Sequence, residues 1–314
     1  MNIVIVGTGL IGGSVALAIR GFNTHIIGVD SNEQNCKKAL DLGIIDEVST
    51  IIPKSNAFLQ FCKKALDLGI IDEVSTLDNA LLEAHLVILA IPVDAARKLL
   101  PHILDCIQET AVVVDMGSTK VGICNNVRSH ARRSQFVASH PMAGTENSGP
   151  EAAFADLFKG KKTIICEKEL SADFALHQAE LLYKILGMTI LYMNAEEHDK
   201  HIAYVSHLTH VIAYALSLTV QEIEKDEKTI FEMAGSGFGS TVRIAKSSTD
   251  MWTPIFKQNA KYLTASIDKY IDILQHFKQV IQENKEVELY DMIKEANKIR
   301  NVLDKPNMQV KTKK

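Results

Sequence analysis

A glycine-rich turn between two apolar segments constrains the fold of this chain more than any other feature. Residues 2–6 (NIVIV) form a continuous apolar run, which indicates a strand buried on both faces. The turn GTGLIG (7–12) follows at once, a helical pattern continues to residue 19, and a second apolar run (25–29) ends in Asp30. This order of strand, glycine turn, helix, strand and acid is typical of a parallel α/β sheet that binds a dinucleotide.

The three glycines of the turn have separate physical tasks. Gly7 permits the tight turn, Gly9 lets the backbone approach a pyrophosphate, and Gly12 lets helix and strand pack closely. The phosphates would then lie on free N–H groups at the helix N-terminus. The Asp30 carboxylate can bind a ribose 2′-hydroxyl and would repel a 2′-phosphate, so NAD is favoured over NADP. The alternative is a glycine turn without function. The predicted cofactor-binding residues are Gly7, Thr8, Gly9, Leu10, Ile11, Gly12 and Asp30.

The rest of the chain divides into a strand-rich part and a helical part. Further strands are predicted at 86–92, 111–115, 136–138, 163–166 and 188–193. Helical patterns separate them, which indicates a doubly wound sheet. After about residue 194, glycine is nearly confined to one short loop and helical periodicity dominates, including an alternation from 275 to 303. We therefore predict an α/β fold, with an N-terminal Rossmann domain (1–193) followed by an all-helical domain (194–314) of the kind that often dimerises.

Bulk properties exclude several classes of function. The net charge of −4 gives no basic field for nucleic acid. The five cysteines show no CxxC pairing, which suits a reducing compartment. The N-terminus lacks the cationic flank of a signal peptide, and no apolar stretch reaches the length of a membrane span. We expect a cytoplasmic protein with neither a nucleic acid nor a membrane as partner.

Three groups of side chains are candidates for chemistry. His140 lies in a loop after the 136–138 strand, where a neutral imidazole can take a proton from a substrate hydroxyl as hydride leaves; the alternative is a structural histidine. Arg243 follows a glycine-rich loop and can clamp a carboxylate, although a surface ion pair is the commoner outcome. The pairs at 198/201 and 207/210 are histidines spaced to share a helix face, towards a polar cleft. No matching Cys, Asp or Glu completes a tetrahedral site, so no metal is predicted. The single tryptophan, Trp252, is expected in the helical core.

Several of these motifs occur together in one known family. The glycine turn with Asp30 is accompanied by DMGSTK (115–120), HPMAGTENSG (140–149), SHLTHVIAYAL (206–216) and STVRIAKSSTDMW (240–252). This set, in this order, resembles prephenate dehydrogenase. The resemblance implies an NAD-binding Rossmann domain and a helical domain that forms a homodimer. It also implies oxidative decarboxylation of prephenate to 4-hydroxyphenylpyruvate and CO2, in tyrosine biosynthesis.

The resemblance also assigns roles to matching residues. His140 would accept the proton of the ring hydroxyl, and Ser118 would orient that hydroxyl and His140. His210, with His207, would line the substrate pocket, and Arg243 would hold a substrate carboxylate. Arogenate dehydrogenase, a β-hydroxyacid dehydrogenase and a non-catalytic NAD-binding regulator remain as alternatives.

One segment of fifteen residues occurs twice. CKKALDLGIIDEVST stands at 36–50 and again at 62–76, which indicates a copying event in the gene or an error in the sequence. The family plan needs one copy, and removing 26 residues restores its spacing. We predict that the first copy docks after the second strand and that the linker from residue 51 and the second helix form an extra element at the sheet edge. Activity would then survive with a weaker affinity for NAD.

Overall fold

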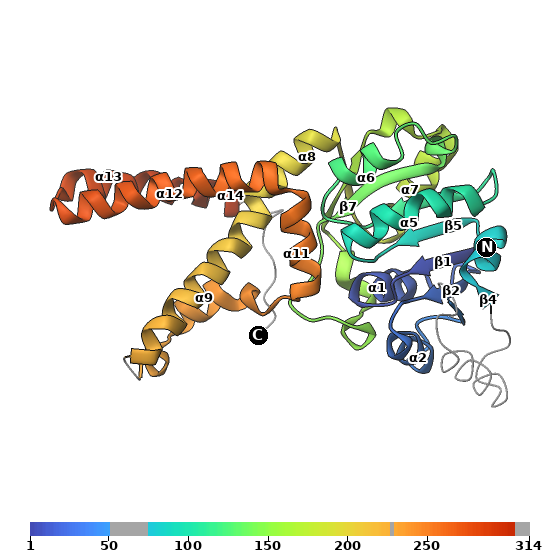
Figure 1. The fold of residues 1–314 in the computed structure, drawn as a ribbon, viewed down its shortest axis with the longest axis horizontal. Coiled ribbons are helices and arrows are strands. Elements are labelled where there is room, and N and C mark those ends of the chain that lie inside the picture. Colours follow the sequence, from blue (N-terminus) through green and yellow to red (C-terminus); the bar gives the residue numbers. More distant parts are fainter. Residues whose placement is uncertain (51–74, 227–228, 305–314) are drawn as a thin grey trace. The chain divides into compact units, whose positions relative to one another are not determined.

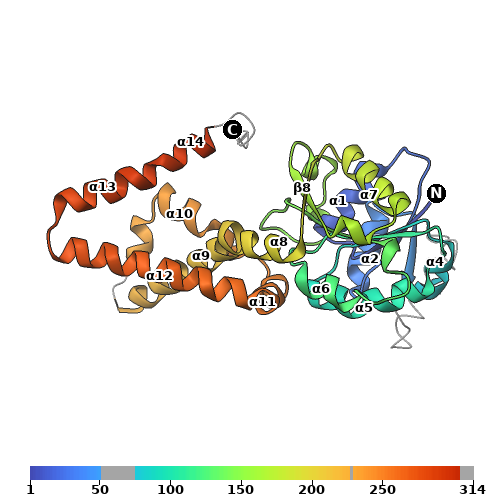
Figure 2. The same cartoon turned by 90° about the horizontal axis from the view of Figure 1, so that it is seen from above.

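The computed structural model of the chain describes residues 1–50, 75–226 and 229–304. It divides into two units, Met1–Leu263 and Thr264–Lys314. The first unit contains a sheet with its covering helices and the first part of the helical region (Figure 1). The second contains most of helix α12 and the helices after it, which Figure 2 shows from above.

The sheet has nine strands among the described residues, in the order β4-β3-β2-β1-β5-β6-β7-β8-β9. Their bounds are β1 Asn2–Val6, β2 His25–Val29, β3 Glu47–Thr50, β4 Ser75–Thr76, β5 Leu86–Leu89, β6 Val112–Asp115, β7 Phe136–Pro141, β8 Lys162–Cys166 and β9 Thr189–Met193. Every pairing is parallel except that of β7 with β8. The strands predicted from apolar runs are therefore confirmed. The strand predicted at 136–138 extends to Pro141, so the expectation that His140 lies in the loop after it was wrong: His140 pairs with Ile164 of β8.

Helices cover both faces of this sheet (Figure 1). Their bounds are α1 Leu10–Ile19, α2 Glu33–Asp41, α4 Leu77–Glu83, α5 Val93–Cys106, α6 Val121–Asn126 and α7 Asp173–Ile185. Alternate residues of β1 point to opposite faces: Ile3 and Ile5 pack with α1, α2 and α7, whereas Val4 and Val6 pack with α4, α5 and α6. A strand buried on both faces must be apolar throughout, which is why these segments read as unbroken hydrophobic runs.

The antiparallel β7–β8 pair was not predicted. Two short 3-10 helices, Pro150–Ala152 and Ala155–Phe158, occupy the connection where a parallel pair would need a crossover α-helix. The chain therefore turns back, and His140 lies opposite Ile164 in the register. The loop from residue 142 still leaves at the carboxyl edge of the sheet, because β7 runs parallel to β6.

The helical region begins with an almost continuous helix. Its parts are α8 Ala195–Ile202, a π-helical turn Ala203–His207 (η5) and α9 Leu208–Asp226. Shorter helices follow: α10 Ser236–Val242, η7 Arg243–Lys246 and α11 Thr249–Gln258. The stretch Ala195–Lys225 is long and apolar enough to cross a membrane by length and composition alone, which the sequence reading missed. Three of its polar side chains are nevertheless buried within the first unit, namely His198, Asp199 and His207.

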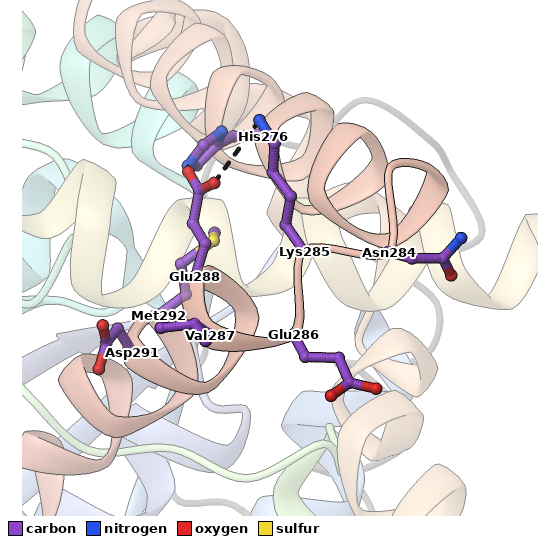
Figure 3. Close-up of a pocket in the computed structure, with 8 residues that line it drawn as sticks. All are labelled: His276, Asn284, Lys285, Glu286, Val287, Glu288, Asp291 and Met292. Carbon is purple, nitrogen blue, oxygen red and sulfur yellow. Dashed lines mark ion pairs between the residues drawn. The ribbon is translucent and has the colours of Figure 1, made fainter.

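The second unit is a helical hairpin. Its helices are α12 Ala260–Gln282, which begins in the first unit, α13 Glu286–Ala296 and α14 Arg300–Leu303. The helical periodicity predicted from 275 to 303 is confirmed, but the helix is interrupted at Asn284, which adopts a left-handed conformation (φ 51°) and reverses the chain. A hollow of about 730 Å³ lies beside this turn (Figure 3). Among its lining residues, Glu288 pairs with His276 (3.4 Å) and with Lys285 (3.8 Å), whereas Glu286 and Asp291 add two further carboxylates. It includes none of the predicted site residues.

The first copy of the repeated segment is the docked one, as predicted. It forms α2, whose Cys36 and Ala39 are buried, and β3, which pairs with β2. Residues 62–74 of the second copy, with the linker and the predicted second helix, lie outside the described residues. Its last two residues form β4 and pair in register with their own duplicates, Ser75 with Ser49 and Thr76 with Thr50. The insertion therefore adds to the outer edge of the sheet.

Candidate functional site

The glycine turn has the geometry that its sequence predicts. Gly7 has φ +100°, and a Cβ there would lie 2.4 Å from the carbonyl oxygen of Ala90. A Cβ on Gly12 would lie 1.9 Å from the carbonyl oxygen of Gly7. Gly9 differs, since a Cβ there would meet nothing within 4 Å. Gly7 and Gly12 are thus fixed by packing, whereas Gly9 borders open space at the N-terminus of α1, where no side chain caps the helix.

Asp30 lies beside this turn, at the carboxyl end of β2. Its carboxylate accepts hydrogen bonds from the backbone N–H of Thr8 (2.9 Å) and from the Thr8 hydroxyl (3.2 Å). The N–H of Asn32 donates to its other oxygen (2.9 Å). The fold therefore brings the predicted cofactor residues, from the turn and from β2, to one corner of the sheet.

His140 lies at the end of β7 and is 8% exposed. Its Nδ1 is 2.8 Å from Nε2 of His198 on α8. The strand beneath it is held by a buried ion pair, in which Lys120 binds Asp115 and also donates to the carbonyl oxygen of Ser139 (2.6 Å). His140 thus has a fixed backbone and one occupied ring nitrogen.

Asp199 connects α8 to the loop that carries Ser118. Its carboxylate accepts from Nδ1 of His198 (2.7 Å) and from the backbone N–H groups of Lys120 (2.8 Å) and Val121 (2.9 Å). Ser118 itself is half-buried, and its hydroxyl has no hydrogen-bond partner among the described residues. The Ser118 hydroxyl can therefore bind a ligand without breaking a hydrogen bond within the protein, while Asp199 holds the loop in place.

The buried histidines are neutral near neutral pH. Burial is the main reason why the pKa of His140 lies well below its ordinary value, and the neighbours His198, Lys120 and His207 lower it further. Burial also lowers the pKa of His198, although Asp199 acts against this, and it lowers the pKa of His207 to about 4. A neutral imidazole can accept a proton, as a general base must.

His207 and His210 both contact Trp252. His207 is fully buried; the side-chain amide of Asn259 donates to its Nδ1 (3.0 Å), which leaves its Nε2 without a partner among the described residues. His210 donates from Nδ1 to the carbonyl oxygen of Ser206 (3.0 Å) and stacks on Trp252, with ring centroids 3.5 Å apart. Trp252 is buried, as predicted, and it also forms one wall for both imidazoles.

Arg243 reaches the loop that follows His140. Its Nη1 donates to Glu146 at 2.7 Å, and the pair is partly exposed. The ion pair that was the alternative to a carboxylate clamp is therefore present. It uses one of five guanidinium N–H groups, so donors remain for a second anion.

The sequence reading missed four contributors to this region: Lys120, Glu146, Asp199 and Asn259. Asp199 directly follows His198, and Lys120 and Glu146 lie within the quoted motifs. The partners of Lys120, Glu146 and Asn259 are 79, 97 and 60 residues away in the chain, so spacing gave no signal. The pairing of His198 with His201 was wrong, because His198 is buried and His201 is exposed.

One further group of side chains has metal-ligand character. Asp78, His102 and Cys106 place ligand atoms within 4.8 Å of one another. Asp78 and His102 are exposed and already form an ion pair (2.8 Å), so the arrangement is complete without a cation. It lies on α4 and α5 and includes none of the predicted site residues.

Comparison with known proteins identifies the family. A family model described as the prephenate dehydrogenase nucleotide-binding domain matches residues 56–192, and one described as the prephenate dehydrogenase dimerization domain matches residues 194–295. The first match takes in the second copy of the repeat, whereas the structure docks the first.

Individual relatives cover nearly the whole chain. A cyclohexadienyl dehydrogenase of Zymomonas mobilis is 30% identical over 305 residues, 96% of either protein. A prephenate dehydrogenase of Bacillus subtilis is 29% identical, over 96% of this chain and 76% of its own length. The structure resembles that of Aquifex aeolicus prephenate dehydrogenase in complex with hydroxyphenyl propionate and NAD+, with 32% identity and a TM-score of 0.81 over 96% of this chain and 98% of that one. This chain belongs to the prephenate dehydrogenase family.

Proposed function

We propose that the protein is an NAD-dependent prephenate dehydrogenase, which converts prephenate to 4-hydroxyphenylpyruvate and CO2. The observation that carries the proposal is the state of His140: a buried, neutral imidazole at the carboxyl edge of the sheet, with only its Nδ1 occupied. Ligands of open α/β sheets bind at this edge. A base of this kind is what removal of a hydroxyl proton requires.

The surrounding residues have distinct tasks in this reaction. His140 accepts the proton of the ring hydroxyl at Nε2, and Ser118 orients that hydroxyl. Arg243 binds a substrate carboxylate with the donors that Glu146 leaves free. His207 and His210 line the substrate pocket with Trp252. Loss of hydride leaves a ring that becomes aromatic by expelling CO2, so proximity, one base and anion binding suffice.

The glycine turn fits NAD. The open space at Gly9 and the uncapped N-terminus of α1 suit a pyrophosphate, and Asp30 suits the ribose 2′-hydroxyl. When bound, NAD supplies the hydride acceptor. Residues 1–193 form the domain for this cofactor, and residues 194–314 form the second domain.

A second copy of the chain covers the helical domain. Several large apolar side chains there are exposed, among them Val205 (71%), Leu218 (65%) and Met233 (86%). Apolar exposure of this extent is typical of an interface. The protein is therefore proposed to be a cytoplasmic homodimer, which accounts for the apolar α8–α9 stretch without a membrane.

Turnover assays test the proposal. NADH formation is measured with prephenate and, separately, with arogenate, in which an amino acid side chain replaces the pyruvyl group. We expect turnover with prephenate, and a large fall in kcat for His140→Asn with NAD binding retained. Turnover with arogenate alone would assign the second substrate, and no turnover with either would support a non-catalytic NAD-binding protein.

A further inference from the structure

Two buried side chains behind His140 form a hydrogen-bonded chain with it. Nδ1 of His140 is 2.8 Å from Nε2 of His198, and Nδ1 of His198 is 2.7 Å from Oδ1 of Asp199. The two rings meet edge to face at 70°, with centroids 5.1 Å apart. His198 and Asp199 are each 1% exposed, so water does not compete for these bonds.

The direction of both bonds follows from Asp199. A carboxylate only accepts hydrogen bonds, and backbone N–H groups already donate to both of its oxygens. His198 must therefore carry a proton on Nδ1. In a neutral imidazole the other nitrogen then has a lone pair, so Nε2 of His198 accepts and Nδ1 of His140 donates. It follows that Nε2 of His140 is unprotonated.

We infer that His198 and Asp199 are positioning residues, which hold His140 in the tautomer that can accept a proton and stabilise the charge that results. This inference rests on the proposed function. When Nε2 of His140 takes the substrate proton, the proton on its Nδ1 can pass to Nε2 of His198, whose Nδ1–H stays on Asp199. One proton enters and none leaves. The positive charge then rests one ring further in, against a carboxylate.

The rest of the site explains why such support is needed. Burial opposes a charge on His140, and the charged or titratable groups around it are His198, Lys120 and His207, all of which lower its pKa. The anion of Asp115 is paired with Lys120. Asp199 is the main group that raises the pKa of His198 against its burial, and Asp115 adds a smaller contribution in the same direction. Asp199 is therefore the counter-charge in direct hydrogen-bond contact with this pair of rings.

Substitutions of His198 separate positioning from simple structural support. His198→Phe has no acceptor for Nδ1 of His140, whereas His198→Gln offers its amide oxygen to His140 and its NH2 group to Asp199. We expect kcat with prephenate to fall about 100-fold or more in the Phe variant, with KM nearly unchanged, and to recover substantially in the Gln variant. His201→Phe, on an exposed position of the same helix, is the matched control. Equal losses in both His198 variants, or a change confined to KM, would overturn the inference.

Asp199→Asn tests the charge separately. The amide oxygen can still accept from His198, but the negative charge is gone, so we expect kcat to fall about 10-fold or more. Unchanged kcat would remove Asp199 from the scheme. Melting temperatures and NAD binding of every variant identify those that fail to fold.

The tautomer itself can be observed without turnover. Long-range 1H–15N NMR of the ligand-free protein, labelled at histidine, distinguishes a protonated from an unprotonated ring nitrogen, and His140→Asn assigns the signals. We expect a proton on Nδ1 and none on Nε2 of His140. A proton on Nε2 would refute the relay even in an active enzyme. Absence of turnover in the parent protein with both substrates would refute the proposed function while leaving this measurement intact.

Discussion

Adding a methyl group to two glycines of the same turn should separate binding from folding. At Gly9 the added Cβ meets nothing within 4 Å, whereas at Gly12 it meets the carbonyl oxygen of Gly7 at 1.9 Å and Cγ2 of Ile5 at 2.9 Å. The same chemical change, Gly→Ala, therefore fills open space in one case and collides with backbone in the other. Each glycine lies within the first turn of α1 or at its N-cap.

The expected change in stability follows from these contacts. In Gly12→Ala, overpacking costs about 1–3 kcal/mol, and the obstacle is backbone that cannot rotate away. The melting temperature should fall by roughly 2–12 °C, at about 2–4 °C per kcal/mol for a domain of this size. Gly9 has φ −72°, which alanine adopts readily. Loss of backbone freedom in the unfolded chain and loss of a preferred N-cap residue nearly offset each other there, so we expect a change of less than about 1 kcal/mol.

The loss of NAD affinity is expected at Gly9, the position where alanine costs little stability. The methyl group of Gly9→Ala occupies the space where a pyrophosphate would approach the N–H groups of α1. A hydrogen bond to a charged group is worth about 1.5–3 kcal/mol, so the loss of one should raise Kd by about 10- to 150-fold. The Gly9 variant should therefore be a stable protein that binds NAD poorly.

Two measurements decide the matter. Thermal unfolding gives the stability of each variant, and a fluorescence titration with NADH gives its dissociation constant. The parent protein is the reference. Ser14→Ala is unsuitable as a control because the Ser14 hydroxyl accepts a hydrogen bond from the N–H of Phe154. Gly21→Ala is unsuitable because Gly21 has φ +95°, which strains alanine. Normal NAD affinity in Gly9→Ala would show that the turn does not cradle the cofactor. Equal destabilisation of both variants would contradict the difference in packing between Gly9 and Gly12.

Three further predictions concern other parts of the molecule. Lys120→Met leaves Asp115 buried without its ion-pair partner and should lower the free energy of unfolding by about 3–5 kcal/mol in urea; no loss would contradict the pairing, and adding Asp115→Asn should restore part of it. Arg243→Gln should raise KM for prephenate about 10-fold or more while leaving the melting temperature nearly unchanged, because a partly exposed ion pair contributes little stability. A changed kcat at constant KM would contradict the role of Arg243 in binding a substrate carboxylate. Deletion of residues 51–76 should lower KM for NAD, and an equal KM in the shortened protein would remove the idea that the repeat weakens cofactor binding.

The sheet could be predicted because its physics is local. A strand covered by helices on both faces must be apolar at every position, and the predicted runs at 2–6 and 25–29 coincide with β1 and β2. The glycine turn could also be predicted, since Gly7 needs a positive φ and Gly12 leaves no room for a side chain. These constraints act between residues that are close in sequence or fixed by the sheet itself.

The polar network could not be predicted in the same way. Nothing in the sequence near Asp199 shows that its carboxylate receives N–H groups from residues 120 and 121, which lie on another element. The i,i+3 spacing of His198 and His201 assumed a shared face, but only His198 points into the protein. The direction of β8 and the reversal at Asn284 likewise depend on how the chain closes in three dimensions.

The repeat shows why the two halves of the site should respond differently to it. β3 and β4 lie outside β2, and the central strands β1, β5, β6 and β7 pair only among themselves and with β2 and β8. Of the site residues on strands, Asp115 and His140 belong to β6 and β7, so no ladder bond joins them to the repeated segment. Asp30 differs, because it directly follows β2, which pairs with β3 from Ile27 to Val29. A disturbance of the outer edge therefore reaches the ribose end of the cofactor site through β2 and stops before the base, so the repeat should change NAD affinity and leave the proton transfer at His140 intact.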